Sequence, residues 1–279
     1  MTNLLAGLAS LLWGTSDFFG GIAVRGRSAV RFGALTQPIG LAVVAIVVAF
    51  VPADPSKTDI RWGLAAGIAT ATSLVTLYRS LAIGPMYVAA PTAAVGGCAV
   101  PVVIGLISGE RPGTVALVGV LLGITAVVLV GIQPEERERR GGHIRNVLAL
   151  SAAAGVAIGT AVACFAQTSP ESGVWPFVAA KLMAALILGS IALFSRQVDA
   201  SAPGRNPWLV PAVGIGDAAA TMLMLLALQR GSLVLVSVLG GLFPVVTVVL
   251  ARALLDQRLT RTQLVGLAVA FLAVVMMTV

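Results

Sequence analysis

Long apolar runs recur along the whole chain, separated by short turns rich in polar residues, Gly or Pro. An α-helix needs about 20 apolar residues to cross the ~30 Å hydrocarbon core of a bilayer, where the backbone must satisfy its own hydrogen bonds. Stretches such as 41–51, 115–130 and 264–279 are apolar on every face, whereas strands of a membrane β-barrel alternate in polarity. The sequence therefore predicts an all-α integral membrane protein.

The composition excludes a water-soluble domain. Hydrophobic residues make up 58% of the 279 residues and charged residues 10%, too little polar surface to cover a core in water. The net charge of +7 comes from Arg residues between the apolar runs, where they orient a membrane protein rather than bind nucleic acid. We therefore expect a lipid bilayer as partner and no nucleic acid.

The sequence predicts no cleaved signal peptide, no disulfide and no metal site. No Lys or Arg precedes the first apolar run and Asp17 interrupts it, so we expect it to be retained rather than cleaved as a signal peptide. Cys98 and Cys164 lie in apolar runs and are predicted to be buried free thiols. His143, the only histidine, has no nearby Cys or Asp partner, and we expect no metal and no cofactor.

The apolar runs predict ten transmembrane spans in two equal groups. The spans are expected at residues 3–23, 30–51, 61–82, 86–107, 113–132, 146–167, 174–194, 208–228, 232–252 and 262–279. A charged linker at 133–145 separates repeat 1–132 from repeat 146–279, and a shift of 147 residues aligns Gly84 with Gly231. Because five spans is an odd number, the second repeat would be inverted, as in many transporters.

The distribution of positive charge predicts an orientation. Thirteen of the 18 Lys and Arg residues lie at connectors after odd-numbered spans, and four lie at the opposite connectors, at Lys57, Arg61, Arg111 and Arg230. Cytoplasmic loops are enriched in Lys and Arg. We therefore expect both termini in the periplasm of an inner (plasma) membrane protein, with the 133–145 loop in the cytoplasm.

Three motifs carry a resemblance to a known family: Trp13-Gly14-Thr15-Ser16-Asp17-Phe18, Tyr78-Arg79-Ser80-Leu81-Ala82-Ile83-Gly84-Pro85 and Gly109-Glu110-Arg111-Pro112. In the second half, Pro244 begins an apolar run that ends at a similar turn, where Gln257 replaces the usual Glu. The whole chain resembles the EamA family of the drug/metabolite transporter superfamily. The resemblance implies a ten-helix exporter of amino acids, other metabolites or drugs, with spans one, three, four, six, eight and nine around a central cavity.

Three charged residues, Asp17, Lys181 and Asp217, lie well inside predicted spans. Each costs about 2.5–3.5 kcal/mol at a helix centre, so each must face protein or a wet cavity. They are candidates for binding a proton or solute, and the alternative is a structural ion-pair network. Gln37 falls near the repeat equivalent of Lys181, and Thr70 falls opposite Asp217.

Neutral polar, aromatic and helix-breaking residues complete the candidate site. Gln37 and Thr70 are predicted either to join helices by hydrogen bonds or to contact solute, and Trp13 and Tyr78 either to stack on solute or to anchor at the interface. Equivalent spans carry possible gating breaks, at Pro91, Gly96, Gly97, Gly240, Gly241 and Pro244. Arg79 and Arg230 are predicted to snorkel or to form gates with Glu110 or Asp256.

These features favour a proton-coupled secondary exporter of small metabolites that works by alternating access. No P-loop sequence supports ATP use, and a buried carboxylate can load and release a proton. The alternatives are an uncoupled facilitator or channel, a lipid scramblase and, less favoured, an intramembrane enzyme; paired Gly residues also leave a homodimer open. We expect Asp17→Asn and Asp217→Asn to fold but lose coupling, unless Lys181 forms a static ion pair with one of them.

Overall fold

The computed structural model describes residues 1–24, 28–50, 52–83, 86–131, 141–194, 207–255 and 260–278. These residues form helices and contain no strand. The elements are α1 (Thr2–Ala23), α2 (Ala29–Val48), α3 (Lys57–Ile83), α4 (Met86–Ile107), α5 (Thr114–Gly131), α6 (Gly141–Ala166), the short 3-10 helix η1 (Pro170–Ser172), α7 (Trp175–Phe194), α8 (Leu209–Leu228), α9 (Leu233–Gly240), α10 (Phe243–Leu255) and α11 (Arg261–Thr278).

Seven segments are long and apolar enough to cross a membrane: α2, α3, α4, α6, α7, α8 and the combined α9–α10 segment. The predicted helical segments agree with the helices with two differences. First, α6 begins at Gly141, inside the predicted linker, whose residues 133–140 lie outside the described part. Second, span 232–252 is two helices, because the chain turns at Gly241 and Leu242.

Side chains next to the helix starts satisfy free backbone N–H groups. The Ser56 hydroxyl accepts the Asp59 N–H at 3.1 Å, and the Asp59 carboxylate accepts the Ser56 N–H at 2.9 Å, which makes a reciprocal capping box at α3. Ser28 caps α2, and Ser232 caps α9. These caps fix where three helices begin at the ends of the bundle.

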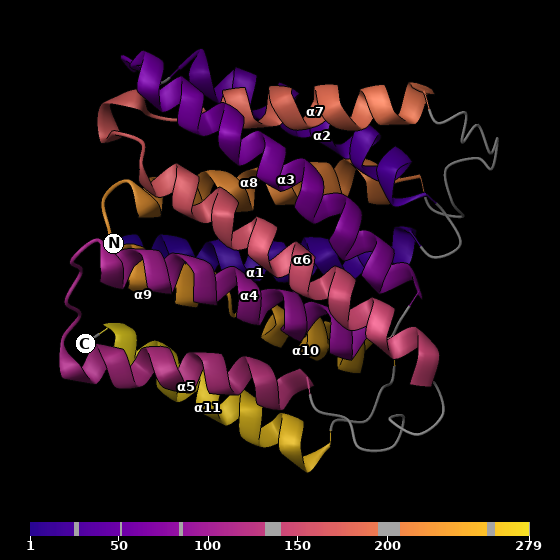
Figure 1. The fold of residues 1–279 in the computed structure, drawn as a ribbon, viewed down its shortest axis with the longest axis vertical. Helices are drawn as coiled ribbons and strands as arrows, with labels where there is room; N and C mark the ends of the chain where they lie inside the picture. The colour runs from indigo at the N-terminus through magenta and orange to yellow at the C-terminus, as the bar shows by residue number, and fades with distance from the viewer. Residues whose placement is uncertain are drawn as a thin grey trace.

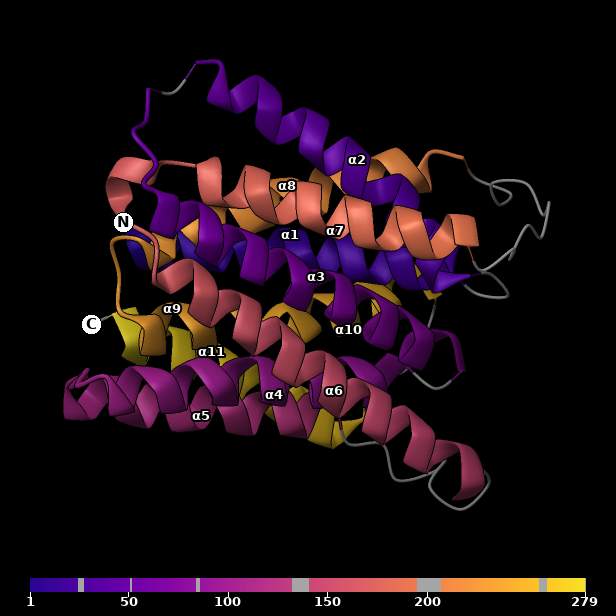
Figure 2. The same cartoon turned by 45° about the horizontal axis from the view of Figure 1, so that its top comes forward.

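The helices run side by side as one bundle with two distinct edges (Figures 1 and 2). α2 and α7 pack together along one edge, and α5 and α11 pack along the opposite edge. Between these edges α1 packs on α8, α3 on α6, and α4 on α6. The structure therefore places α5 and α11 along one edge of the bundle and α2 and α7 along the other.

Small residues allow the closest helix contacts. A Cβ on Gly155 of α6 would lie 2.5 Å from the Ala93 carbonyl oxygen of α4, and a Cβ on Gly67 of α3 would lie 2.5 Å from the Ala180 carbonyl oxygen of α7. Gly119 of α5 packs in the same way on Met277 of α11. Because lipid is as apolar as a helix face, such close packing supplies much of helix association in membranes. The paired glycines thus serve contacts within this chain.

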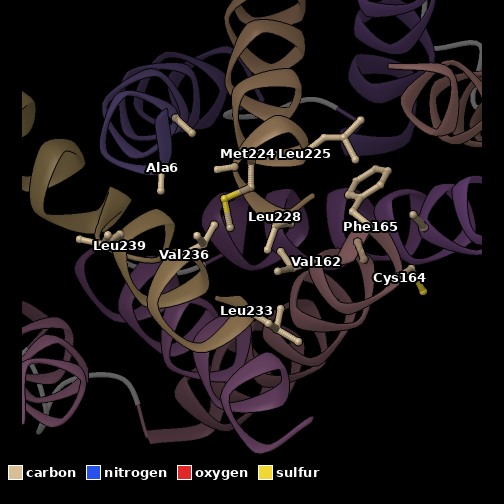
Figure 3. Packing of buried hydrophobic residues seen from close by; sticks show 14 of the residues in the cluster. Ala6, Val162, Cys164, Phe165, Met224, Leu225, Leu228, Leu233, Val236 and Leu239 are labelled. Carbon is tan, nitrogen blue, oxygen red and sulfur yellow. The ribbon is translucent and has the colours of Figure 1, made fainter. Parts of the chain in front are cut away.

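An apolar core fills the space where α8 and α9 meet α6 (Figure 3). Met224, Leu225 and Leu228 of α8 lie beside Leu233, Val236 and Leu239 of α9 and Val162 and Phe165 of α6. Phe165 also meets Phe177 of α7 edge to face, with ring centroids 6.4 Å apart. This core holds the turn between α8 and α9 against α6.

Both termini lie at the same end of the bundle (Figure 1). The Asn3 side-chain amide donates to the Met277 carbonyl at 3.2 Å, which joins the beginning of α1 to the end of α11. The α2–α3, α4–α5, α6–α7 and α8–α9 connections lie at this end too, which we call the terminal end.

Candidate functional site

Lys181 of α7 and Asp217 of α8 form an ion pair inside the bundle. The Lys181 Nζ donates to Asp217 Oδ2 at 2.6 Å and to Gln37 Oε1 of α2 at 3.0 Å. It also lies 5.2 Å from the centre of the Phe177 ring. The Lys181 side chain is 2% exposed and the Asp217 side chain 23% exposed. The ammonium is therefore sealed by protein, whereas the carboxylate retains accessible surface.

The Gln37 amide is oriented by this lysine. An ammonium only donates hydrogen bonds, so Gln37 must present its oxygen to Lys181. Gln37 is 1% exposed, and its Nε2 is buried without a hydrogen-bond partner. An unmade buried hydrogen bond costs about 1–3 kcal/mol. Gln37 thus holds the ammonium in place, while both N–H donors of its NH2 group have no acceptor among the described residues.

Asp17 of α1 lies beside Asp217 of α8, and the two carboxylates interact electrostatically. Ser16 and Gly216 bring the two helices together, because the Ser16 hydroxyl occupies the position that a Cβ on Gly216 would take. Asp17 is half-buried and, within the described part of the chain, makes no hydrogen bond or ion pair. The site therefore combines one paired carboxylate with one that has no partner.

The same two helices position Trp13. Its Nε1 donates to the Thr221 hydroxyl at 3.3 Å, and that hydroxyl donates to the Asp217 carbonyl at 2.8 Å. Trp13 precedes Asp17 by four residues and Thr221 follows Asp217 by four, so each pair shares a helix face. Trp13 is thereby fixed one helical turn from the unpaired carboxylate.

Tyr78 and Thr70 of α3 have different surroundings. Tyr78 is 2% exposed, meets Phe32 edge to face at 5.3 Å between ring centroids, and lies within electrostatic reach of Asp17 and Asp217. It is inside the bundle rather than on the outer surface. Within the described residues, the Thr70 side chain makes no hydrogen bond to the Lys181 group, and its carbonyl accepts from Ser73 at 2.9 Å.

The predicted helix breaks behave differently in the two halves. α4 continues through Pro91, Gly96 and Gly97, and both glycines face α6. The chain is interrupted at Gly241, where the Cys98 sulfur fills the space that a Cβ would need. Gly240 ends α9, and Pro244 is the second residue of α10. A helix interruption is therefore present in the second half, beside α4.

Glu110 joins the two halves at the terminal end, a contact that the sequence reasoning missed. Its carboxylate accepts from the Ser232 hydroxyl at 2.5 Å, from the Leu233 N–H at 2.8 Å and from the Val234 N–H at 3.1 Å. Gly109, with φ +96°, makes the turn that presents it. Arg230 is exposed and does not pair with Glu110, so that predicted gate is wrong. Its partners lie 122–124 residues away in the sequence, so no local pattern signalled the contact.

Two more polar contacts tie connections together at this end. The Asp59 carboxylate accepts the Ser169 N–H at 2.7 Å, which links the start of α3 to the α6–α7 connection. The Gln229 amide at the end of α8 donates to the Gly173 carbonyl at 2.9 Å and to the Ser172 hydroxyl at 3.2 Å. The terminal end is thus closed by hydrogen bonds between connections of both halves.

The fold and site define a multi-pass helical membrane protein with ionisable side chains inside its bundle; no cluster of three or more His, Cys, Asp or Glu for a metal occurs in the described residues. Residues 145–279 match the EamA-like transporter family, which lies within the drug/metabolite transporter superfamily, so the resemblance is confirmed over the second half of the chain. Members of this family are transporters rather than enzymes.

The comparison with solved structures supports the same fold. One crystal structure with 18% sequence identity superposes with a TM-score of 0.76, over 99% of this chain and 96% of that chain. In total, 28 solved chains match. No curated protein matches the sequence.

Proposed function

We propose that this protein is a secondary transporter that moves a small solute by alternating access, driven by exchange with protons. The observation that carries the proposal is the accessible, unpaired carboxylate of Asp17 beside the Lys181–Asp217 ion pair, inside helices that span a membrane. Intramembrane ionisable groups mark ion and solute pathways by default. An uncoupled facilitator, a channel or a scramblase needs no such group.

The proposed architecture is ten transmembrane helices in two inverted repeats, 1–132 and 146–279, with α9 and α10 forming one broken span. Equivalent contacts support it. Gly67 of α3 packs on Ala180 and Met183 of α7, and Gly214 of α8 packs on Thr36 and Ile39 of α2. Gly214 follows Gly67 by 147 residues. Ala180 follows Thr36 by 144 residues, and Met183 follows Ile39 by the same 144 residues.

Lys181 follows Gln37 by the same 144 residues, so their hydrogen bond joins equivalent positions of the proposed repeats. Two equivalent groups meet only on the axis that relates the repeats. The charged cluster then lies where the two halves move against each other, which is where transporters of this kind bind solute. Breaking Glu110 away from α9 would open the terminal end in the alternate state.

Asp17 is the proposed coupling residue. Two groups face it, Asp217 of α8 and Tyr78 of α3. One oxygen of Asp217 accepts a hydrogen bond from the Lys181 ammonium of α7. With a proton on Asp17, the cluster holds one carboxylate and one ammonium and carries no net charge. In the alternate facing state, water or solute replaces this arrangement and the proton leaves.

The proposed setting is the inner membrane, with periplasmic termini and a cytoplasmic linker, and the support is the Arg and Lys distribution. The termini meet at one end of the bundle, as an even number of spans requires. The glycine pairs are used within the chain, so they give no support to a homodimer.

The decisive experiment uses proteoliposomes containing a trapped pH indicator and a panel of amino acids and primary amines. Solute addition to the wild type should move protons, and Asp17→Asn should abolish this movement while solute exchange at saturating concentration persists. Asp54→Asn, an exposed carboxylate at the terminal end, is the matched control and should behave as the wild type. Proton movement that survives in Asp17→Asn would refute the coupling role.

A further inference from the structure

We infer that the solute site selects a primary or secondary amine attached to an apolar body, and excludes anions. This inference rests on the proposed function and names its substrate class. It follows from which charges of the cluster a solute can reach, rather than from which charges are present.

The positive charge of the cluster is closed to solute. The Lys181 ammonium is held by Asp217 and Gln37 and faces the Phe177 ring. Gly40 of α2 closes the remaining side, because a Cβ there would lie 3.1 Å from Lys181 Cε and 3.3 Å from Nζ. With 2% of its side chain exposed, Lys181 offers no hydrogen bond to an anionic solute.

The negative charges remain open. The Asp217 side chain is 23% exposed although one of its oxygens binds Lys181, and Asp17 is half-buried without a hydrogen bond or ion pair among the described residues. Two carboxylates against one ammonium leave one negative charge in the cluster when both are ionised. An approaching solute therefore meets carboxylate oxygens, which accept hydrogen bonds from an ammonium.

An apolar surface continues from the carboxylates along α1. Trp13 lies one turn before Asp17 and is partly exposed, and Gly240 leaves room for its ring, since a Cβ there would lie 3.6 Å from that ring. Trp rings are suited to apolar groups and to cations. The arrangement fits an ammonium on Asp17 and an apolar body along Trp13.

The test compares probes of matched shape and opposite charge on the detergent-purified full chain. 2-Phenylethylamine and 3-phenylpropionate are titrated calorimetrically, followed by methylamine, ethylamine and benzylamine. The amine should bind saturably, and the carboxylate should not. Asp17→Asn should weaken amine binding by about 10–100-fold, as expected for loss of one charge-assisted contact. Asp54→Asn should leave binding unchanged.

Equal binding of the carboxylate, equal amine affinity in Asp17→Asn, or no saturable binding of any amine in the series would each overturn the inference. No gradient is present in this assay, so its result is independent of coupling. Proton exchange that requires Asp17, without amine binding, would leave the transporter standing and remove the substrate class. Amine binding that requires Asp17, without proton movement in liposomes, would keep the substrate class and refute the proton coupling.

Discussion

Replacing Asp217 should destabilise the protein far more than replacing Asp17, although both changes remove one carboxylate from the same cluster. Asp217→Asn takes away the charged partner of an ammonium that is 2% exposed and leaves it with neutral acceptors, the new Asn oxygen and Gln37 Oε1. An uncompensated buried charge costs about 3–5 kcal/mol. Asp17→Asn breaks no hydrogen bond and removes repulsion from Asp217, so its effect should stay within about 1 kcal/mol.

The assay is reversible unfolding of the purified protein in lipid nanodiscs for four variants that form a cycle: wild type, Lys181→Met, Asp217→Asn and the double variant. The double variant contains no buried ammonium, and it should recover most of the stability that Asp217→Asn loses. The coupling free energy of the cycle then measures the pair itself. Adding Asp17→Asn to Asp217→Asn should destabilise further, because it removes the remaining carboxylate of the cluster.

The Lys181–Asp217 ion pair changes one sequence-based expectation. Both Asn variants were expected to fold and to lose coupling, unless a static ion pair intervened, and the structure places that pair at Asp217. Asp17→Asn therefore remains the clean test of coupling, whereas Asp217→Asn should express poorly. Equal stability of Asp217→Asn and Asp17→Asn would refute the view that Lys181 depends on Asp217.

Three other outcomes follow from the structure. Glu110→Ala should lose about 1–3 kcal/mol of stability, because the Leu233 N–H loses its acceptor, and cysteine labelling at the terminal end should increase. Gly155→Ala should cost about 1–3 kcal/mol, since its Cβ would meet the Ala93 carbonyl, whereas a Cβ at Gly189 meets nothing within 4 Å and Gly189→Ala should stay within about 1 kcal/mol in the same thermal assay. A C-terminal fluorescent reporter that matures only in the cytoplasm should stay dark; bright cells would overturn the proposed orientation.

The helix positions could be predicted from the sequence because hydropathy alone sets them. The break between α9 and α10 is different: Pro91, Gly96 and Gly97 made α4 an equal candidate, yet α4 is continuous. Glycines in a membrane helix serve either a break or a close contact, and only the neighbouring helix decides. In α4 that neighbour is α6, whereas Gly241 faces the Cys98 side chain.

The charged members of the site could also be predicted, because Asp and Lys are costly in lipid and must gather inside the bundle. Their pairing could not be predicted. Asp17 and Asp217 had equal standing as partners of Lys181, and the choice depends on how α7 lies against α8, which brings Nζ to 2.6 Å from Asp217 Oδ2. The contacts of Glu110 and Gln229 escaped notice for a related reason, since their partners lie in connections distant in sequence.

The Gln37–Lys181 contact explains why the two proposed repeats cannot be identical at this point. Equivalent residues on the axis lie side by side, and two ammonium groups about 4 Å apart would repel by about 4 kcal/mol at an effective dielectric constant of 20. Lys on one repeat therefore requires a hydrogen-bond acceptor on the other, and the Gln37 oxygen supplies it at 3.0 Å. Because Lys181 then takes its counter-charge from Asp217 on its own repeat, Asp17 of the first repeat is left unpaired. The difference between Gln37 and Lys181 at the proposed axis thus leaves Asp17 as the carboxylate that can take a proton or an amine.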